Sequence, residues 1–96
     1  QMKHIDEIYR GARIALRLGS MEKVIDYLEI VRLNDISANA WTRGNNSGRN
    51  DYYNKMIIKS DRTYEKAKKI AIGNGWKIDT AGGLYWEISD TKGKIE

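Results

Sequence analysis

The stretch YYNKMIIKSDRTYEKAKKIAIGNG, residues 52–75, decides the fold because it joins a helical pattern to a clear stop signal. Its basic side chains recur three and four residues apart, a spacing that places them on one face of an α-helix. The helix is expected to end at Gly73-Asn74-Gly75, since glycine and asparagine favour a turn there. The cations of this face, which we call the basic stripe, are Lys55, Lys59, Arg62, Lys66 and Lys69.

Apolar or small side chains fall on the opposite face, at Tyr53, Ile57, Tyr64, Ala67 and Ala71. Both faces keep their phase across Ser60, which predicts a single helix over residues 52–74. The alternative is a strand-like segment over residues 52–59, because Tyr-Tyr and Met-Ile-Ile have β propensity, with a fresh helix capped at Ser60-Asp61. In that case the first two lysines leave the basic stripe.

Two further helices are predicted before this one. Residues 3–18 carry an apolar stripe at helical spacing, and residues from Met21 onward carry a second stripe that we expect to be buried. Gly19 suits the end of the first helix and Ser20 the N-cap of the second, so a short connection should make them an antiparallel pair. The first stripe is Ile5, Ile8, Tyr9, Ala12, Ala15 and Leu16, and the second is Met21, Val24, Ile25, Leu28 and Val31.

Residues 34–51 are rich in Asn, Gly, Ser and Arg. Asn and Gly tolerate turn conformations, so we expect a long, mostly irregular loop, and such loops are often functional. Arg43 and Arg49 suit phosphate or base-edge contacts, although the glycine spacing fits neither a P-loop nor a dinucleotide-binding motif. We expect Trp41, in the middle of this segment, and Tyr53 to fold inward.

Residues 76–80 and 84–89 alternate between apolar and polar side chains, as in two strands joined by a turn at Ala81-Gly82-Gly83. Residues 91–96 form a polar tail, which we expect to be frayed. The prediction is a single small α+β domain over residues 2–90, with three main helices and a C-terminal two-stranded antiparallel hairpin.

Composition limits the class of protein. Ninety-six residues, 41% of them hydrophobic, suffice for one small folded domain. Cysteine is absent, which excludes disulfides and fits a cytoplasmic protein. No apolar run approaches the roughly 18 residues of a membrane span, and no signal-peptide pattern occurs. Gln1 precedes Met2, so we expect the natural chain to begin at Met2.

Catalytic chemistry is not assembled in this sequence. His4 is the only histidine, and without cysteine the usual transition-metal sites cannot be built. The carboxylates mostly alternate with Lys or Arg, as on solvated helix faces, and no pair stands out for acid–base work. We therefore expect a binding protein rather than an enzyme, with no metal and no cofactor.

A net charge of +4 and a pI near 9.4 suit an anionic partner. The order helix, helix, loop, helix, hairpin resembles the layout of winged-helix DNA-binding domains, in which the helix before the wing enters the major groove. The long segment between the second and third helices departs from that layout. The hypothesis is a DNA-binding protein, with RNA less favoured, whose contacts are Lys55, Lys59, Arg62, Lys66, Lys69, Arg43, Arg49 and Lys77.

The alternative is a small protein inhibitor or adaptor, of the kind that phages and mobile elements encode, which docks on an acidic or nucleoprotein partner. Aromatic and arginine side chains dominate such interfaces, and here they are Trp41, Tyr52, Arg49 and Tyr85. A second basic row on the first helix, Arg10, Arg13 and Arg17, adjoins the basic stripe if packing allows. A homodimer is a further alternative, because a hairpin edge can pair with a copy of itself.

Overall fold

The computed structural model describes residues 2–80 and 83–95, and the side chains of residue 5 onward within them. Its elements are α1 (Met2–Leu18), α2 (Met21–Asn46), α3 (Asn50–Gly73), β1 (Lys77–Asp79), β2 (Glu87–Asp90) and β3 (Gly93–Lys94). The predicted α+β class is confirmed, with three strands in place of two. Within the described ranges, no helix has the length and apolar character needed to cross a membrane.

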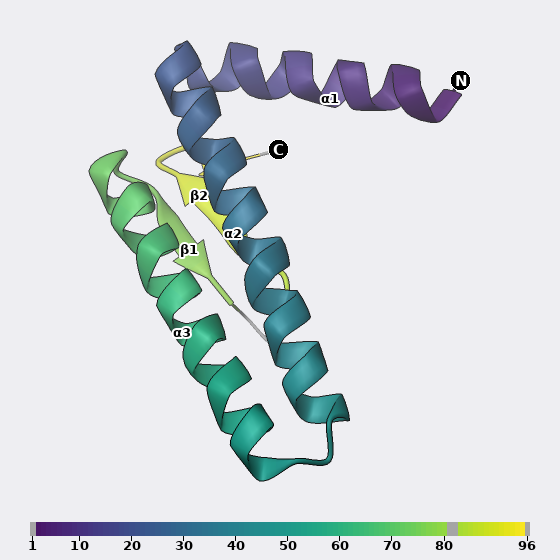
Figure 1. Ribbon diagram of the computed structural model, residues 1–96. Coiled ribbons are helices and arrows are strands. Elements are labelled where there is room, and N and C mark those ends of the chain that lie inside the picture. The colour runs from purple at the N-terminus through teal and green to yellow at the C-terminus, as the bar shows by residue number, and fades with distance from the viewer. Residues whose placement is uncertain (1, 81–82, 96) are drawn as a thin grey trace.

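The two long helices organise the molecule. Figure 1 shows α2 and α3 side by side and antiparallel, joined at one end by a tight connection. The antiparallel sheet, in the order β1-β2-β3, lies against this pair near its other end. Helix α1 crosses the start of α2 and projects away from the pair. The predicted antiparallel packing of the first two helices is therefore wrong.

The boundary between α1 and α2 lies where the sequence places it. Gly19 has φ 77°, a left-handed conformation that favours glycine, and its N–H donates to the Ala15 carbonyl at 3.0 Å. The Ser20 hydroxyl accepts from the Lys23 N–H at 3.2 Å and caps α2. The turn at Gly19 and Ser20 is correctly predicted, but these caps do not determine the angle between α1 and α2.

The apolar stripes predicted for these helices lie largely on exposed faces. Among the described side chains of α1, Ile14 and Leu18, on the other side of the helix, are the two that enter the core. In α2 the core is reached by Ile30 and Leu33, while the predicted stripe is exposed except for half-buried Val24. The predicted stripe of α2 does not pack on α3. The α2 face that contains Ile30 also carries the small side chains that let α3 approach, so this face packs on α3 instead.

The irregular loop predicted over residues 34–51 is wrong. Helix α2 continues to Asn46, and only Ser47, Gly48 and Arg49 connect it to α3. Gly48 has φ 68°, so this tight connection does use a glycine for its turn. Five polar or small residues of the segment are buried, namely Asn34, Ser37, Ala38, Ala40 and Gly44.

Asn34 shows why the composition of this segment misleads. Its buried side chain donates from Nδ2 to the Leu84 carbonyl at 2.8 Å and accepts at Oδ1 from the Trp86 N–H at 2.8 Å. Ser37 lies next along the same face, with its Oγ 2.7 Å from the Ser60 Oγ on α3. These side chains bond across the structure rather than to their own backbone, so they do not break the helix.

Gly44 sits at a close contact between the two long helices. A Cβ at this position would lie 3.0 Å from the Met56 Cβ and 3.5 Å from the Tyr53 carbonyl oxygen. Gly44 is buried within α2 and its φ is not positive, so this glycine provides close approach rather than a turn. The small side chains of Ala40 and Ser37 continue this contact along α2.

Helix α3 runs unbroken across Ser60, so the single-helix prediction is confirmed and the strand alternative over residues 52–59 is wrong. Its buried residues are Met56, Thr63, Ala67 and Ala71. The last two belong to the predicted apolar face, whereas Tyr53 is 39% exposed and does not fold inward as expected. The face of α3 that packs on α2 is therefore centred nearer to Met56 than to Tyr53.

The sheet keeps the predicted alternation, but its second strand begins at Glu87 rather than at residue 84. Strands β1 and β2 pair antiparallel with Ile78 opposite Ile88, and the predicted turn lies partly outside the described residues. The segment expected to be a frayed tail instead contributes β3, which pairs with β2. Ile95 then packs into the core with 2% of its surface exposed, and its N–H donates to the Ile88 carbonyl at 2.8 Å.

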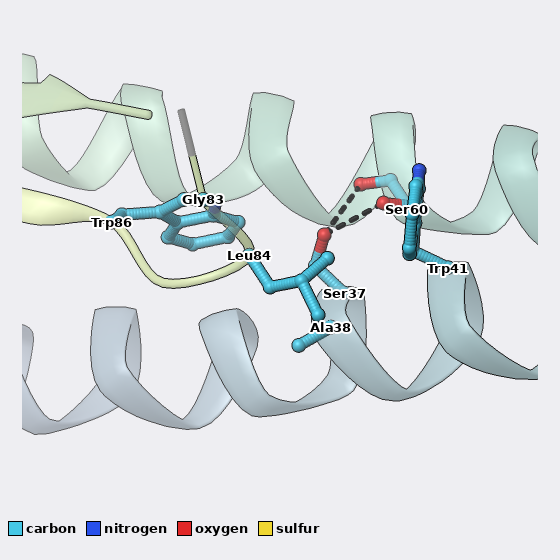
Figure 2. A pocket seen from close by; sticks show the side chains of 7 residues that line it. All are labelled: Ser37, Ala38, Trp41, Ser60, Gly83, Leu84 and Trp86. Atoms are coloured by element: carbon cyan, nitrogen blue, oxygen red, sulfur yellow. Dashed lines mark hydrogen bonds between the residues drawn. The ribbon is translucent and has the colours of Figure 1, made fainter. Parts of the chain in front are cut away.

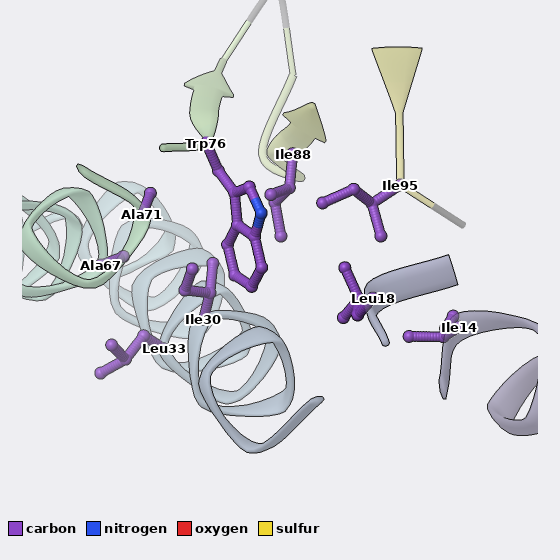
Figure 3. Close-up of a cluster of buried hydrophobic side chains, with 9 residues drawn as sticks. All are labelled: Ile14, Leu18, Ile30, Leu33, Ala67, Ala71, Trp76, Ile88 and Ile95. Atoms are coloured by element: carbon purple, nitrogen blue, oxygen red, sulfur yellow. The ribbon is translucent and has the colours of Figure 1, made fainter. Parts of the chain in front are cut away.

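The core forms where the sheet, α2, α3 and the end of α1 meet. Figure 3 shows the Trp76 indole at its centre, above Ile30 and beside Ile88. Tyr27 contacts the Trp76 ring edge-on, with centroids 6.4 Å apart. Burying each such large apolar side chain contributes roughly 1.5–3 kcal/mol, which is why a small sheet suffices to hold the helices together.

A charged clasp fixes the end of α1 to the sheet. Arg17 donates from Nη2 to Asp90 Oδ1 at 2.8 Å and from Nε to Oδ2 at 3.3 Å, and Nη2 also reaches the Gly93 carbonyl at 3.0 Å. The hydrogen bonds from Arg17, with a further one from the Lys92 N–H, hold the pKa of Asp90 below its usual value.

We expect Gly44→Ala to be destabilising relative to the matched change Gly73→Ala. Both glycines are helical, so alanine gains up to roughly 1 kcal/mol of helix propensity at either site. At Gly73 nothing lies within 4 Å of the added Cβ, whereas at Gly44 the added Cβ would lie 3.0 Å from the Met56 Cβ and α3 must shift by a few tenths of an ångström to accept it. Urea denaturation measures the difference, and equal free energies of unfolding for the two variants would contradict the close contact.

Acidification should weaken the Arg17–Asp90 clasp. Because the folded-state pKa of Asp90 lies below its ordinary value of 3.8, its stabilisation is present above that value and is lost as the pH falls through the lowered pKa. The free energy of unfolding should therefore decline below about pH 4 in the wild type, and less steeply in Asp90→Asn. Identical pH profiles for the two proteins would show that the clasp is not stabilising.

Candidate functional site: a basic groove between α2 and α3

A groove of about 840 Å³ runs between the two long helices. It lies on the face away from the sheet, because the segment that leads into β2 lines a separate pocket with Ser37 and Ser60 on the other side of the same helices. Ten residues line the groove: Arg32, Leu33, Ile36, Lys55, Met56, Ile58, Lys59, Arg62, Thr63 and Lys66.

Positive charge dominates the walls of this groove. Four of the five cations of the basic stripe line it, from Lys55 to Lys66, and Arg32 faces them from α2. These four cations and Arg32 are all exposed, and none of the described lining residues is acidic. Among the residues that the structure describes, the four stripe cations form no ion pair, so their charges remain available to a ligand.

The floor of the groove is apolar. Leu33 and Met56 are buried at the helix contact, while Ile36 is half-buried and Ile58 is 52% exposed. A row of cations beside aliphatic side chains can contact a ligand that has both charged and apolar surface.

Glu29 sets the charge at one end of the groove. It accepts two hydrogen bonds from Arg32, Nε to Oε1 at 2.7 Å and Nη2 to Oε2 at 2.8 Å. This contact, reinforced by the nearby charge of Lys66, lowers the pKa of Glu29. Glu29 therefore holds Arg32 in place and offsets part of its charge.

The remaining predicted contact residues lie outside the lining of the groove. Lys69 is exposed one turn beyond Lys66 on α3 and does not line the groove. Arg43 lies seven residues after Ile36 and so shares its face of α2, beyond the lined part. Arg49 is at the start of α3, where its Nε lies 4.0 Å from Asp51 Oδ1. Lys77 is on β1, pointing to the opposite sheet face from Ile78, which packs toward the core.

The aromatic residues of the alternative interface do not line the groove. Trp41 is 43% exposed, contrary to the expectation that it folds inward, and lines a second pocket of about 360 Å³. Figure 2 shows Trp41 at one end of this pocket beside Ser60, and Trp86 at the other end. Tyr85 is 70% exposed next to the pocket, while Tyr52 is half-buried on α3.

The second basic row does not extend the groove. Arg17 is engaged by Asp90, and Arg10 and Arg13 line a shallow hollow of α1 with Asp6 and Tyr9. Within the described part of the chain, no group of three or more acidic or histidine side chains could hold a metal ion. The side chain of His4 lies outside the described residues.

Arg32 and Glu29 are the residues that sequence reasoning missed. Their spacing of three residues is an ordinary helix pair, and Arg32 joins the site only because α2 continues past Leu33 toward Ile36. Recognising residues 34–46 as helix would have placed Arg32, Ile36 and Arg43 on one face.

Comparison with known proteins finds no matching family model, no similar curated protein and no similar solved structure.

Proposed function

We propose that the chain is a nucleic-acid-binding protein whose basic groove holds the phosphate backbone, with duplex DNA favoured over RNA. The observation that carries the proposal is the convergence of five cationic side chains, from two helices, on one groove without a lining carboxylate. Such a surface neutralises phosphates and releases their counterions. The exposed aliphatic edge at Ile58 would contact sugar or base surface between the phosphates.

Arginine and lysine play different parts in this proposal. Arg62 can bond one phosphate bidentately, whereas the lysines act as mobile point charges along the groove. Phosphate contacts supply affinity and position rather than sequence readout, so we expect binding with weak sequence preference.

Replacing Lys59 or Arg62 with alanine should weaken duplex binding and reduce its salt dependence. Each lost phosphate contact lowers the slope of log affinity against log salt by about 0.9. Lys77→Ala is the matched control, because it removes the same charge from the sheet side. Fluorescence anisotropy with a labelled DNA duplex at several salt concentrations measures the slopes. The absence of binding at low salt, or an equal loss in Lys77→Ala, would overturn the proposal.

Glu29→Gln should strengthen binding, because it frees Arg32 and removes the negative charge near Lys66. The salt slope should steepen by up to about 0.9 as Arg32 gains a phosphate contact. Glu65→Gln is the control: it removes the same charge from a similar helix pair, in which Lys68 Nζ lies 3.0 Å from Glu65 Oε1 and which does not line the groove. If both variants gain affinity equally, net charge rather than the groove governs binding.

A second candidate function is docking of a protein partner on the sheet side of the molecule. The half-exposed Trp41 beside an apolar pocket, with the exposed Tyr85 nearby, favours it, because aromatic side chains often dominate protein interfaces. A partner captured after nuclease treatment and retained by Arg62→Glu, but lost with Trp41→Ala, would support docking. Retention by Trp41→Ala and Tyr85→Ala would exclude this face.

A further inference from the structure

Helix α1 exposes an apolar face that nothing in the described chain covers. The exposed fractions are 54% for Ile5, 62% for Ile8, 68% for Tyr9 and 84% for Leu16. The helix is anchored through its other side, by Ile14 and Leu18 in the core and by Arg17 on the sheet. Figure 1 shows it projecting from the body of the molecule, so this face is open to a partner along its length.

The spacing of this face is that of a coiled-coil seam. Ile5, Tyr9, Ala12 and Leu16 are separated by four, three and four residues, which is the a/d pattern of two heptads. Ile8 and Ala15 widen the seam on one side. A solvated helix would not be expected to place its large apolar residues in this register.

We propose that α1 pairs antiparallel with α1 of a second copy of this chain. A two-fold axis near the middle of the helix places Ile5 opposite Leu16 of the other copy, and Tyr9 opposite Ala12. Tyr9 then packs against the small Ala12 and Ile5 against Leu16, and the symmetry repeats both contacts.

Charge selects a second copy and the antiparallel direction. Asp6 and Arg13 lie on the same side of α1 as Tyr9, one heptad apart and flanking the seam. Antiparallel pairing brings Asp6 of each copy to Arg13 of the other, whereas parallel pairing sets both side chains against the uncharged positions of Ile8 and Ala15. Within the described residues neither side chain forms an ion pair, so both remain available.

The proposed interface is modest in size. One helix of 17 residues presents less than the roughly 800 Å² per partner of a standard stable complex, so we expect a reversible, concentration-dependent dimer. Pairing through the sheet edges, the competing route, is limited by the edge strands β1 and β3, which have three and two residues.

Sedimentation velocity of the full chain over a range of concentrations tests the pairing. The wild type should shift from monomer to dimer, and Leu16→Glu should stay monomeric. Because Leu16 is exposed in the single chain, circular dichroism should show this variant folded like the wild type. A wild type that remains monomeric at every concentration, or a dimer that survives Leu16→Glu, would overturn the proposal.

A charge swap tests the antiparallel direction. Asp6→Arg alone and Arg13→Asp alone should each weaken the dimer, because each sets like charges face to face. Combining both changes in one chain should restore it, and mixing the two single variants should give a heterodimer. A double variant as weak as the single ones would contradict the antiparallel pairing.

Cysteine cross-linking provides an independent check, because the chain contains no native cysteine. A mixture of Tyr9→Cys and Ala12→Cys chains should form the mixed disulfide, and Arg10→Cys, facing away from the seam, should not cross-link with either. Cross-linking that is equally efficient for all pairs would overturn the proposed seam.

Discussion

The close approach of α2 and α3 is the constraint on which the rest of this structure depends. A Cβ at Gly44 would lie only 3.0 Å from the Met56 Cβ, and the Ser37 Oγ lies 2.7 Å from the Ser60 Oγ. Close packing leaves one face of the helix pair for the sheet and the other for the basic groove. Because Arg32 and the lysines of α3 come from different helices, the groove exists only while the helices hold this separation and register.

The sheet is tied to the helix pair by a second specific contact. Asn34 satisfies both a backbone carbonyl and a backbone N–H of the segment leading into β2, and leaving these groups unpaired would cost about 1–3 kcal/mol each. Trp76 and Ile95 then fill the space between sheet and helices. The C-terminal residues are part of the folded unit for this reason.

Local patterns in the sequence predicted α3, the caps at Gly19 and Ser20, and the apolar–polar alternation of the hairpin. They failed over residues 34–46, because Asn, Ser and Gly look like loop residues unless their tertiary partners are known. The same limit applies to the site. The basic stripe was found from α3 alone, but Arg32 required the extended α2. Periodicity also marked Ile8 and Leu16 as apolar without indicating that nothing within the described chain covers them.

The groove is the feature from which function is inferred, and mapping the ligand onto it is the most direct test. Amide chemical shifts followed during titration with a short DNA duplex locate the contact residue by residue. Binding in the groove should perturb Ile36, Lys59 and Thr63 most, and leave Lys77 and Tyr85 nearly unchanged. Perturbations centred on the sheet, or none at low salt, would contradict a nucleic-acid-binding groove between α2 and α3.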